Sequence, residues 1–192
     1  MSYPPYHFVC KDWFTISSFI KTFPLGTIIT YFEDEIYTSH IPFIIQNKKL
    51  IGHIDKKNPQ FLHLDKAKVE VIFHAGSAYI SPSEFETDEL PTFNYAKVHV
   101  KGKAVYVDDS RLIQSLVDMT SEMDDSFKIE KNHPRINKLK HFIQGVEISM
   151  DAFHGRFKMS QDKSPAHFEK AKLMLGESQK SKLCEFLNTL KV

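Results

Sequence analysis

Apolar and polar side chains alternate over short runs through the first half of the chain. Such alternation, broken by short polar connections, is typical of half-buried antiparallel strands. We expect strands at 25–32, 36–46 and 50–54 to form a meander, with the second strand interrupted or edged at Pro42. Further strands are expected at 68–74, at 78–82 and at 93–107, followed by a strand pair at 145–160.

The pattern of the long run at 93–107 indicates which of its side chains lie on which face of the strand. Its alternation changes phase near Gly102, which predicts a bulge or bend there. Side chains two residues apart share a face of a strand. Tyr95 and His99 therefore lie on one face, and we expect Val98 and Val100 on the other face to point into the core.

Helical spacing of apolar residues recurs at five places outside these strands. The expected helices are 11–22, a helical turn at 58–64 capped by Asn58, then 109–120, 134–143 and 165–190, and residues 84–90 are expected to be an acidic surface loop. This order predicts an α+β fold: a small antiparallel barrel with peripheral helices, built as a single domain over residues 1–192.

Charge and cysteine content narrow the class of protein. The 192 residues carry 25 Lys and Arg against 24 Asp and Glu, a net charge of +1, which speaks against direct DNA binding and favours an oligomer. Cys10 and Cys184 form no disulfide framework, the first residues have no signal-peptide pattern, and no apolar stretch approaches the roughly 18 residues of a membrane span. We therefore expect a cytoplasmic protein with no membrane segment.

Catalytic and metal-binding motifs are missing from the sequence. There is no GxSxG, P-loop or GxGxxG pattern, and the 10 histidines form no HxH or HxxxH pair, so no metal site is predicted. Whether the protein is an enzyme stays open at this point.

Four segments combine residue types that suit a phosphorylated aromatic ligand. The first holds Ser39, His40 and Pro42. The second is the strand-to-helix junction at 50–60, where His53, Lys56 and Asn58 could bind a phosphate, although spacing alone favours an ordinary capped helix beside a solvated lysine pair. The third covers 78–83 and 91–102, rich in aromatic rings, and the fourth is the basic stretch 155–161, which alone is typical of a surface loop.

Five stretches of the chain, taken together, resemble the PaiB-type FMN-binding family of negative transcriptional regulators. They are SHIPF, LIGHIDKKNPQ, VIFHAGSAYISPS, PTFNYAKVHVKG and GRFKMSQ. This resemblance implies a flavin-reductase-like split barrel that forms a homodimer with flavin mononucleotide (FMN) between the subunits. It also implies a regulator or flavin-dependent sensor. The split-barrel fold leaves two alternatives, an FMN-dependent oxidoreductase and a haem-binding relative.

The resemblance and the segments together give a set of expected cofactor contacts. Tyr95 and His99 are expected to face the cofactor cleft, and His53, Lys56 and Asn58 to form its phosphate end, with Lys56 where the family has Arg. The full set is Ser39, His40, Pro42, His53, Lys56, Asn58, Asn94, Tyr95, His99, Lys158, Ser160 and Gln161.

Overall fold

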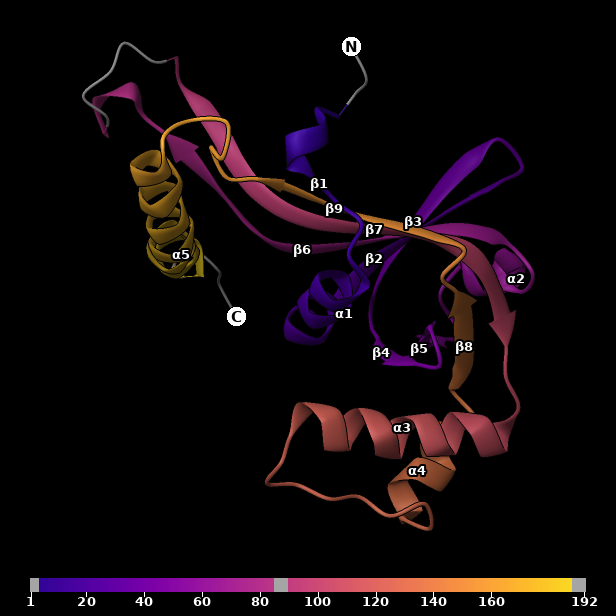
Figure 1. Ribbon diagram of the computed structural model, residues 1–192. Helices are drawn as coiled ribbons and strands as arrows, with labels where there is room; N and C mark the ends of the chain where they lie inside the picture. Colours follow the sequence, from indigo (N-terminus) through magenta and orange to yellow (C-terminus); the bar gives the residue numbers. More distant parts are fainter. Residues whose placement is uncertain (1–3, 85–89, 188–192) are drawn as a thin grey trace.

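The computed structural model describes residues 4–84 and 90–187, and Figure 1 shows their arrangement. The strands are β1 (Val9–Cys10), β2 (Leu25–Phe32), β3 (Glu35–Pro42), β4 (Ile44–Gln46), β5 (Lys49–Asp55), β6 (Lys68–Ile80), β7 (Thr92–Tyr106), β8 (Ile143–Ser149) and β9 (Ala152–Lys158). The helices are α1 (Trp13–Thr22), α2 (Phe61–Leu64), α3 (Asp109–Met123), α4 (Pro134–Leu139) and α5 (Pro165–Leu187), with 3-10 turns η1 (Tyr6–Phe8) and η2 (Pro82–Glu84).

All strand pairs are antiparallel, in the order β3-β2-β6-β7-β8-β5-β4, with β9 added to β7 and β1 added to β9. The two ends of this path, β3 and β4, are consecutive in the chain, and no ladder joins them within the described residues. The sheet therefore curls into a barrel that stays open along one seam. This arrangement, with helices outside it, confirms the predicted α+β split barrel (Figure 1).

Strand β7 is the longest strand and pairs with three others. It lies against β6 for most of its length, against β9 from Tyr95 to Lys101, and against β8 from Ala104 to Tyr106. The predicted strand pair at 145–160 is present, but β8 and β9 follow one another along β7 and do not pair with each other. Beyond the barrel, the far ends of β6 and β7 continue as an arm beside α5 (Figure 1).

The core fills the barrel with β-branched and aromatic side chains. Val71, Phe73, Val98 and Val100 are each 0 % exposed, so the middle of the inner face of β6 and β7 is removed from water. Burying a side chain of this size contributes about 1.5–3 kcal/mol each. The predicted inward orientation of Val98 and Val100 is confirmed.

The expected meander of the first three strands is wrong in its pairing. β2 and β3 form a hairpin, but the strand is interrupted at Phe43, between β3 and β4. The amide of Phe43 donates to the carbonyl of Pro24 at 2.9 Å. The next hairpin, β4–β5, joins the opposite end of the sheet. Pro42 cannot continue a ladder as a donor, and Phe43 turns into the core, where it is 1 % exposed. The break at Pro42 is therefore the seam of the barrel.

The predicted bulge at Gly102 is also wrong. The β6–β7 register is regular there, with Val69 opposite Gly102, and shifts instead between His74 and Gly76. Gly102 is required for a different reason: a Cβ at this position would lie 1.7 Å from the carbonyl oxygen of Ser149. The glycine lets the end of β8 approach β7. Burial keeps one phase through this position, with Val100, Gly102 and Ala104 buried and Lys101 and Lys103 exposed.

The helices lie where they were expected, but some of their ends differ. The predicted cap of the turn at 58–64 is wrong: α2 begins at Phe61 with Gln60 as its N-cap, and Asn58 accepts from the amide of Gln60 in the turn before the helix. Asp12 caps α1 by accepting from the amide of Thr15 at 2.7 Å, and Pro134 opens α4. The predicted helix 134–143 ends at Leu139, because Ile143 already pairs with Asp55 as the first residue of β8. The expected acidic loop at 84–90 falls largely on residues 85–89, outside the described ranges, as does the end of the predicted helix beyond Leu187.

Candidate functional site

The outward-pointing side chains of β3, β2, β6, β7 and β9 form one continuous surface, here called the outer sheet face. The pairing registers align His40 with Thr27, Thr27 with Ile72, Ile72 with His99, and His99 with His154. Residues that face each other across neighbouring strands lie on the same side of the sheet. Side chains that are far apart in the sequence thus form a single row across five strands.

The neighbouring row on this face is cationic. Lys97 of β7 lies opposite His74 on β6 and opposite Arg156 on β9, and Arg156 in turn lies opposite Val9 of β1. Towards the arm, Tyr79 and Phe93 contact edge to face with ring centroids 5.6 Å apart. The outer sheet face therefore changes from charged in its middle to aromatic at the arm.

Hydrogen bonds and ring stacking connect the side chains in the middle of this face. His99 Nδ1 donates to Glu70 Oε1 at 2.9 Å, the His99 ring stacks on His154 with centroids 5.0 Å apart, and Arg156 Nε donates to His154 Nε2 at 3.2 Å. Burial, followed by the charges of His99 and Arg156, lowers the pKa of His154. A neutral His154 ring can accept this hydrogen bond from Arg156. The lowered pKa of His154 therefore agrees with the geometry of the contact.

Two hollows open on the outer sheet face and share Arg156. The smaller, of about 330 Å³, is lined by Tyr95, Phe93, His74, Lys97 and His99 among others. The larger, of about 880 Å³, lies between β9 and the first residues of the chain and is lined by Tyr6, Phe153, Lys11 and His154 among others. Both combine apolar walls with cationic side chains, as ligand sites for anionic aromatic molecules do.

Burial and a neighbouring lysine also affect His74, on the rim of the smaller hollow. Its pKa is lowered by burial first and by the charge of Lys97 second, while the Ala96 backbone opposes this. Lys97 and Arg156 therefore carry positive charge at the hollow near neutral pH, with His74 as a neutral donor or acceptor on its rim.

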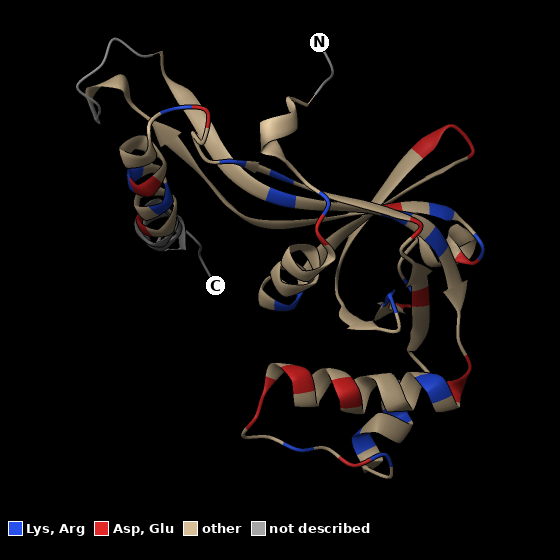
Figure 2. Ribbon diagram, in the orientation of Figure 1, with Lys and Arg blue, Asp and Glu red and all other residues tan. Residues whose placement is uncertain are grey.

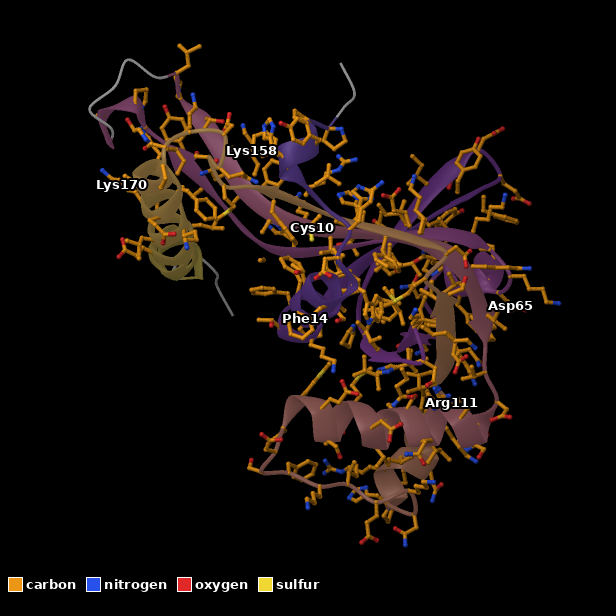
Figure 3. The ribbon with its side chains drawn as sticks, viewed as in Figure 1. Cys10, Phe14, Asp65, Arg111, Lys158 and Lys170 are labelled. Atoms are coloured by element: carbon orange, nitrogen blue, oxygen red, sulfur yellow. The ribbon has the colours of Figure 1, made fainter. Side chains whose placement is uncertain are left out.

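Five of the twelve expected contact residues lie on the outer sheet face: His40, Pro42, Tyr95, His99 and Lys158. Tyr95 and His99 both line the smaller hollow. His40 Nδ1 lies 3.0 Å from Thr27 Oγ1. The ammonium group of Lys158, labelled in Figure 3, donates a hydrogen bond to Thr92 Oγ1.

A second group lies inside the barrel beneath α2. Ser39 is 7 % exposed, and its hydroxyl accepts from Asn58 Nδ2 at 2.8 Å. Asn58 Oδ1 accepts from the amide of Gln60, whose own side chain donates to Thr30 Oγ1 at 2.8 Å. The polar atoms of Ser39 and Asn58 are therefore used to hold α2 against β2 and β3.

A third group fixes the turn after β9. Asn94 is 0 % exposed, and its Nδ2 donates to Ser160 Oγ at 3.0 Å. Ser160 adopts a φ of 57°, in the left-handed region. Gln161 accepts from the amide of Met159 and donates to the carbonyl of His7 at 3.0 Å. These three side chains bond to the chain itself at the base of the arm.

His53 and Lys56 lie on the other side of the barrel. Ile51, two residues before His53 on β5, packs against Met119 of α3, so His53 faces the same helical side. Burial lowers the pKa of His53, and its Nδ1 has no protein partner among the described residues. Lys56 Nζ donates to the carbonyl of Lys140 at 3.2 Å. Within one chain the structure does not bring His53 and Lys56 to the outer sheet face.

Lys97, Arg156, His74 and His154 are the residues that the expected set missed. Each stands two residues from a neighbour on the same face of its strand: His74 from Ile72, Lys97 from His99, and Arg156 from His154 and Lys158. The alternation that placed Tyr95 and His99 already put Lys97 beside them. What the sequence did not contain was the register that brings β9 next to β7.

The outer sheet face offers the chemistry that FMN requires. A flavin needs an apolar or aromatic wall, edge donors and a cationic end for its phosphate, and Tyr95, His99, Lys97 and Arg156 supply these types around one hollow. Among the described residues, no three His, Cys, Asp or Glu side chains are grouped so as to hold a metal ion. In the same part of the chain, no helix combines the length and apolar character needed to cross a membrane.

Comparison with solved structures identifies the fold independently. An FAD- and haem-binding protein of Mycobacterium smegmatis superposes with a TM-score of 0.65 at 14% identity, covering 85% of this chain and 80% of that one. The flavocytochrome Anf3 of Azotobacter vinelandii gives a TM-score of 0.63 at 11% identity, covering 79% and 69% respectively. At these identities the likeness shows a shared split-barrel fold.

Comparison of sequences identifies the family. The protease synthase and sporulation protein PAI 2 of Bacillus subtilis is 26% identical over 177 residues, which cover 86% of this chain and 85% of that protein. The family model described as "Putative FMN-binding domain" matches residues 2–152, which include β1 to β8. The chain therefore belongs to this FMN-binding domain family, as the sequence motifs predicted.

Proposed function

We propose that the protein binds FMN on the outer sheet face and acts as a flavin-dependent regulator or sensor. The observation that carries this proposal is the smaller hollow, where Tyr95 and His99 lie beside Lys97 and Arg156. Family membership supports the identity of the ligand. The low cysteine content, Cys10 and Cys184 with no CxxC pair, supports the expected cytoplasmic location.

The hollow suggests how the cofactor lies. Tyr95 and Phe93 offer ring faces for the isoalloxazine, and His99, held by Glu70, offers a ring nitrogen at its edge. Lys97 and Arg156 supply the charge for a phosphate dianion, and Arg can bind it through two parallel hydrogen bonds. The carboxylate of Glu70 is paired with His99, which reduces its repulsion of the phosphate.

We further propose that the protein is a homodimer whose subunits meet over the outer sheet face. The hollows are shallow on one chain, and apolar side chains around them, such as Phe93 at 57% and Leu25 at 59% exposure, lie open to solvent. A second copy would cover this apolar surface and close the cofactor site. In that arrangement each chain supplies half of the site.

The test compares two lysines of the same strand and the same face. Lys97 lines the smaller hollow and Lys101 does not. We expect Lys97→Gln to weaken FMN binding about tenfold, or about 1.4 kcal/mol, while Lys101→Gln leaves it within about twofold. Flavin fluorescence quenching during titration of the apoprotein measures both affinities. Equal loss in the two variants would contradict a site at this hollow.

The alternatives are separated by spectroscopy and turnover. The absorption spectrum and the mass of the released cofactor distinguish FMN from haem in the purified protein. Consumption of a reduced nicotinamide cofactor in the presence of an electron acceptor distinguishes an oxidoreductase from a sensor. A haem spectrum without flavin would overturn the proposal.

A further inference from the structure

The larger hollow, of about 880 Å³, is not used by the flavin site at Tyr95 and Lys97. It lies over the outward side of β1 and β9, where Val9 pairs with Arg156, and Tyr6 of η1 borders it. Its volume falls in the range of about 300–1,000 Å³ that small-molecule sites occupy. The fold therefore has room for a second ligand beside the flavin.

The charged side chains that line this hollow are cationic. They are Lys11 and Arg156, and none of the described carboxylates is among the lining residues. Figure 2 shows basic positions on β9, on β7 and in the chain after β1. Two carboxylates adjoin the lining in sequence: Asp151 is exposed, and Asp12 accepts from the amide of Thr15 at 2.7 Å. The hollow therefore favours an anion.

Aromatic rings supply the apolar wall of the hollow. The Tyr6 ring is 84% exposed, and its centroid lies 5.3 Å from that of His7 in an edge-to-face arrangement. Phe153 contacts Trp13, with ring centroids 5.4 Å apart, so the core side of the wall is held in place. An exposed ring such as that of Tyr6 can stack on a planar molecule, which makes an aromatic ligand the best fit.

Arg156 lies on the border between the two hollows and lines both. Its Nε donates to His154 Nε2 at 3.2 Å, and the His154 ring stacks on His99 with centroids 5.0 Å apart. These contacts hold the guanidinium where an anion in either hollow interacts with its charge. Because two anions beside one cation repel each other, each ligand should weaken the binding of the other.

We propose that the larger hollow binds a second small molecule, a planar aromatic anion. Tyr6 stacks on its ring, while Lys11 and Arg156 bind its carboxylate or phosphate. The place of this ligand beside a flavin rests on the proposed function, whereas the hollow and its lining do not. Through Arg156 the second ligand acts on the cofactor, so it is the kind of signal to which a flavin-dependent sensor responds.

Isothermal titration calorimetry of the purified protein tests this site with two anionic probes, adenosine monophosphate and salicylate. Adenosine and phenol are their controls without the anionic group, and inorganic phosphate is the control without the ring. We expect at least one anionic probe to bind with a Kd below about 1 mM, and about tenfold more tightly than its controls. A preference for adenosine monophosphate indicates a phosphorylated ligand, and a preference for salicylate a carboxylate. Equal binding of a control would contradict the roles of Tyr6, Lys11 and Arg156.

Two exposed residues line the larger hollow but not the smaller, and they test its position. Tyr6→Ala should weaken the probe at least about fivefold, and Lys11→Gln about fivefold to tenfold. Lys68→Gln removes the same charge from an exposed lysine on β6 that lines neither hollow, and it should bind the probe within about twofold of the unmodified protein. FMN affinity should also stay within about twofold in each variant, which shows that the variants are folded. An equal loss of probe binding in Lys68→Gln would refute the site.

Titration with and without saturating FMN measures the coupling through Arg156. We expect FMN to weaken the probe by a limited factor of about threefold to tenfold, and the probe to weaken FMN by the same factor. Competition without limit would place the probe in the smaller hollow, and independent binding would separate it from Arg156; either result overturns the proposal. So does the absence of binding at about 5 mM probe, as when a partner subunit fills the hollow. If the unmodified protein fails to bind FMN, the proposed function is wrong, while the probe titration of the same sample still decides the second site.

Discussion

The two faces of the β6-β7-β9 sheet are made from alternate residues of the same strands, yet they differ in almost every physical property. On the inner face Val71, Val98 and Val100 are 0 % exposed and belong to the hydrophobic core. On the outer face Lys97 and Arg156 line a hollow that is open to ligand. The inner face stabilises the barrel, and the outer face is available for binding.

This comparison explains why a conspicuous motif is not the same as a binding site. Asn94 and Tyr95 are adjacent in the sequence, but Asn94 is buried against Ser160 while Tyr95 lines the smaller hollow. A segment that resembles a family can therefore contain residues that maintain the fold beside residues that contact the cofactor.

The largest expected effect comes from placing a charge on the inner face. Val98→Asp buries an unpaired carboxylate in the core, and we expect a loss of more than about 4 kcal/mol in the free energy of unfolding, enough to unfold the protein. Circular dichroism and thermal melting measure this. The matched change on the outer face, Lys97→Asp, should leave the melting transition nearly unchanged, and a folded Val98→Asp protein would contradict the assignment of faces.

A smaller loss is expected where a buried polar pair is broken. Asn94→Ala removes the partner of Ser160 and leaves a buried hydroxyl unsatisfied, which should cost about 1–3 kcal/mol of stability. Urea denaturation of Asn94→Ala, Ser160→Ala and the double variant gives the coupling energy between the two side chains. Purely additive losses would show that the pair does not act as a unit.

The sequence-based prediction that Lys56 binds the FMN phosphate is tested directly by Lys56→Ala. Because Lys56 Nζ is engaged with the carbonyl of Lys140, we expect FMN affinity to change by less than about threefold and stability to fall by about 0.5–1.5 kcal/mol. Titration with FMN alongside Lys97→Gln ranks the two lysines. A larger loss of FMN affinity in Lys56→Ala than in Lys97→Gln would indicate that the phosphate binds on the α3 side of the barrel.

The smallest effect is a change in acid sensitivity. Burial lowers the folded pKa of His53 below its unfolded value of about 6.5, so the unfolded chain binds the extra proton first. The stabilisation associated with a neutral His53 is therefore present above pH 6.5 and is lost as pH falls through the folded pKa. His53→Gln should melt with a shallower pH dependence in this range, and an unchanged dependence would show that His53 does not titrate differently on folding.

Local patterns in the sequence predicted much of the fold. Alternation placed β2, β5, β6 and β7 and assigned Val98 and Val100 to the core, and helical spacing of apolar residues placed α1, α3 and α4. These signals are carried by neighbouring residues, so they can be read without knowing the tertiary structure.

Pairing between distant segments was not predictable in the same way. The β4–β5 hairpin joins the far end of the sheet because Phe43 enters the core, and Gly102 is required by the approach of Ser149, more than forty residues away. The cationic row of Lys97 and Arg156 depends on the same kind of long-range register. Family motifs pointed to the right ligand class, but they could not separate the residues that line the smaller hollow from those that support the fold.

Strand β7 also constrains how this protein can change over evolutionary time. Its register is regular from Lys103 back to Lys97, with partners on both sides, so inserting or deleting one residue there would turn Lys97 and His99 into the core and Val98 and Val100 out of it. β6 already contains an extra residue at its His74–Gly76 irregularity, where such a change can be absorbed. Relatives should therefore vary β7 by substitution alone and accept length changes on β6 near Gly76.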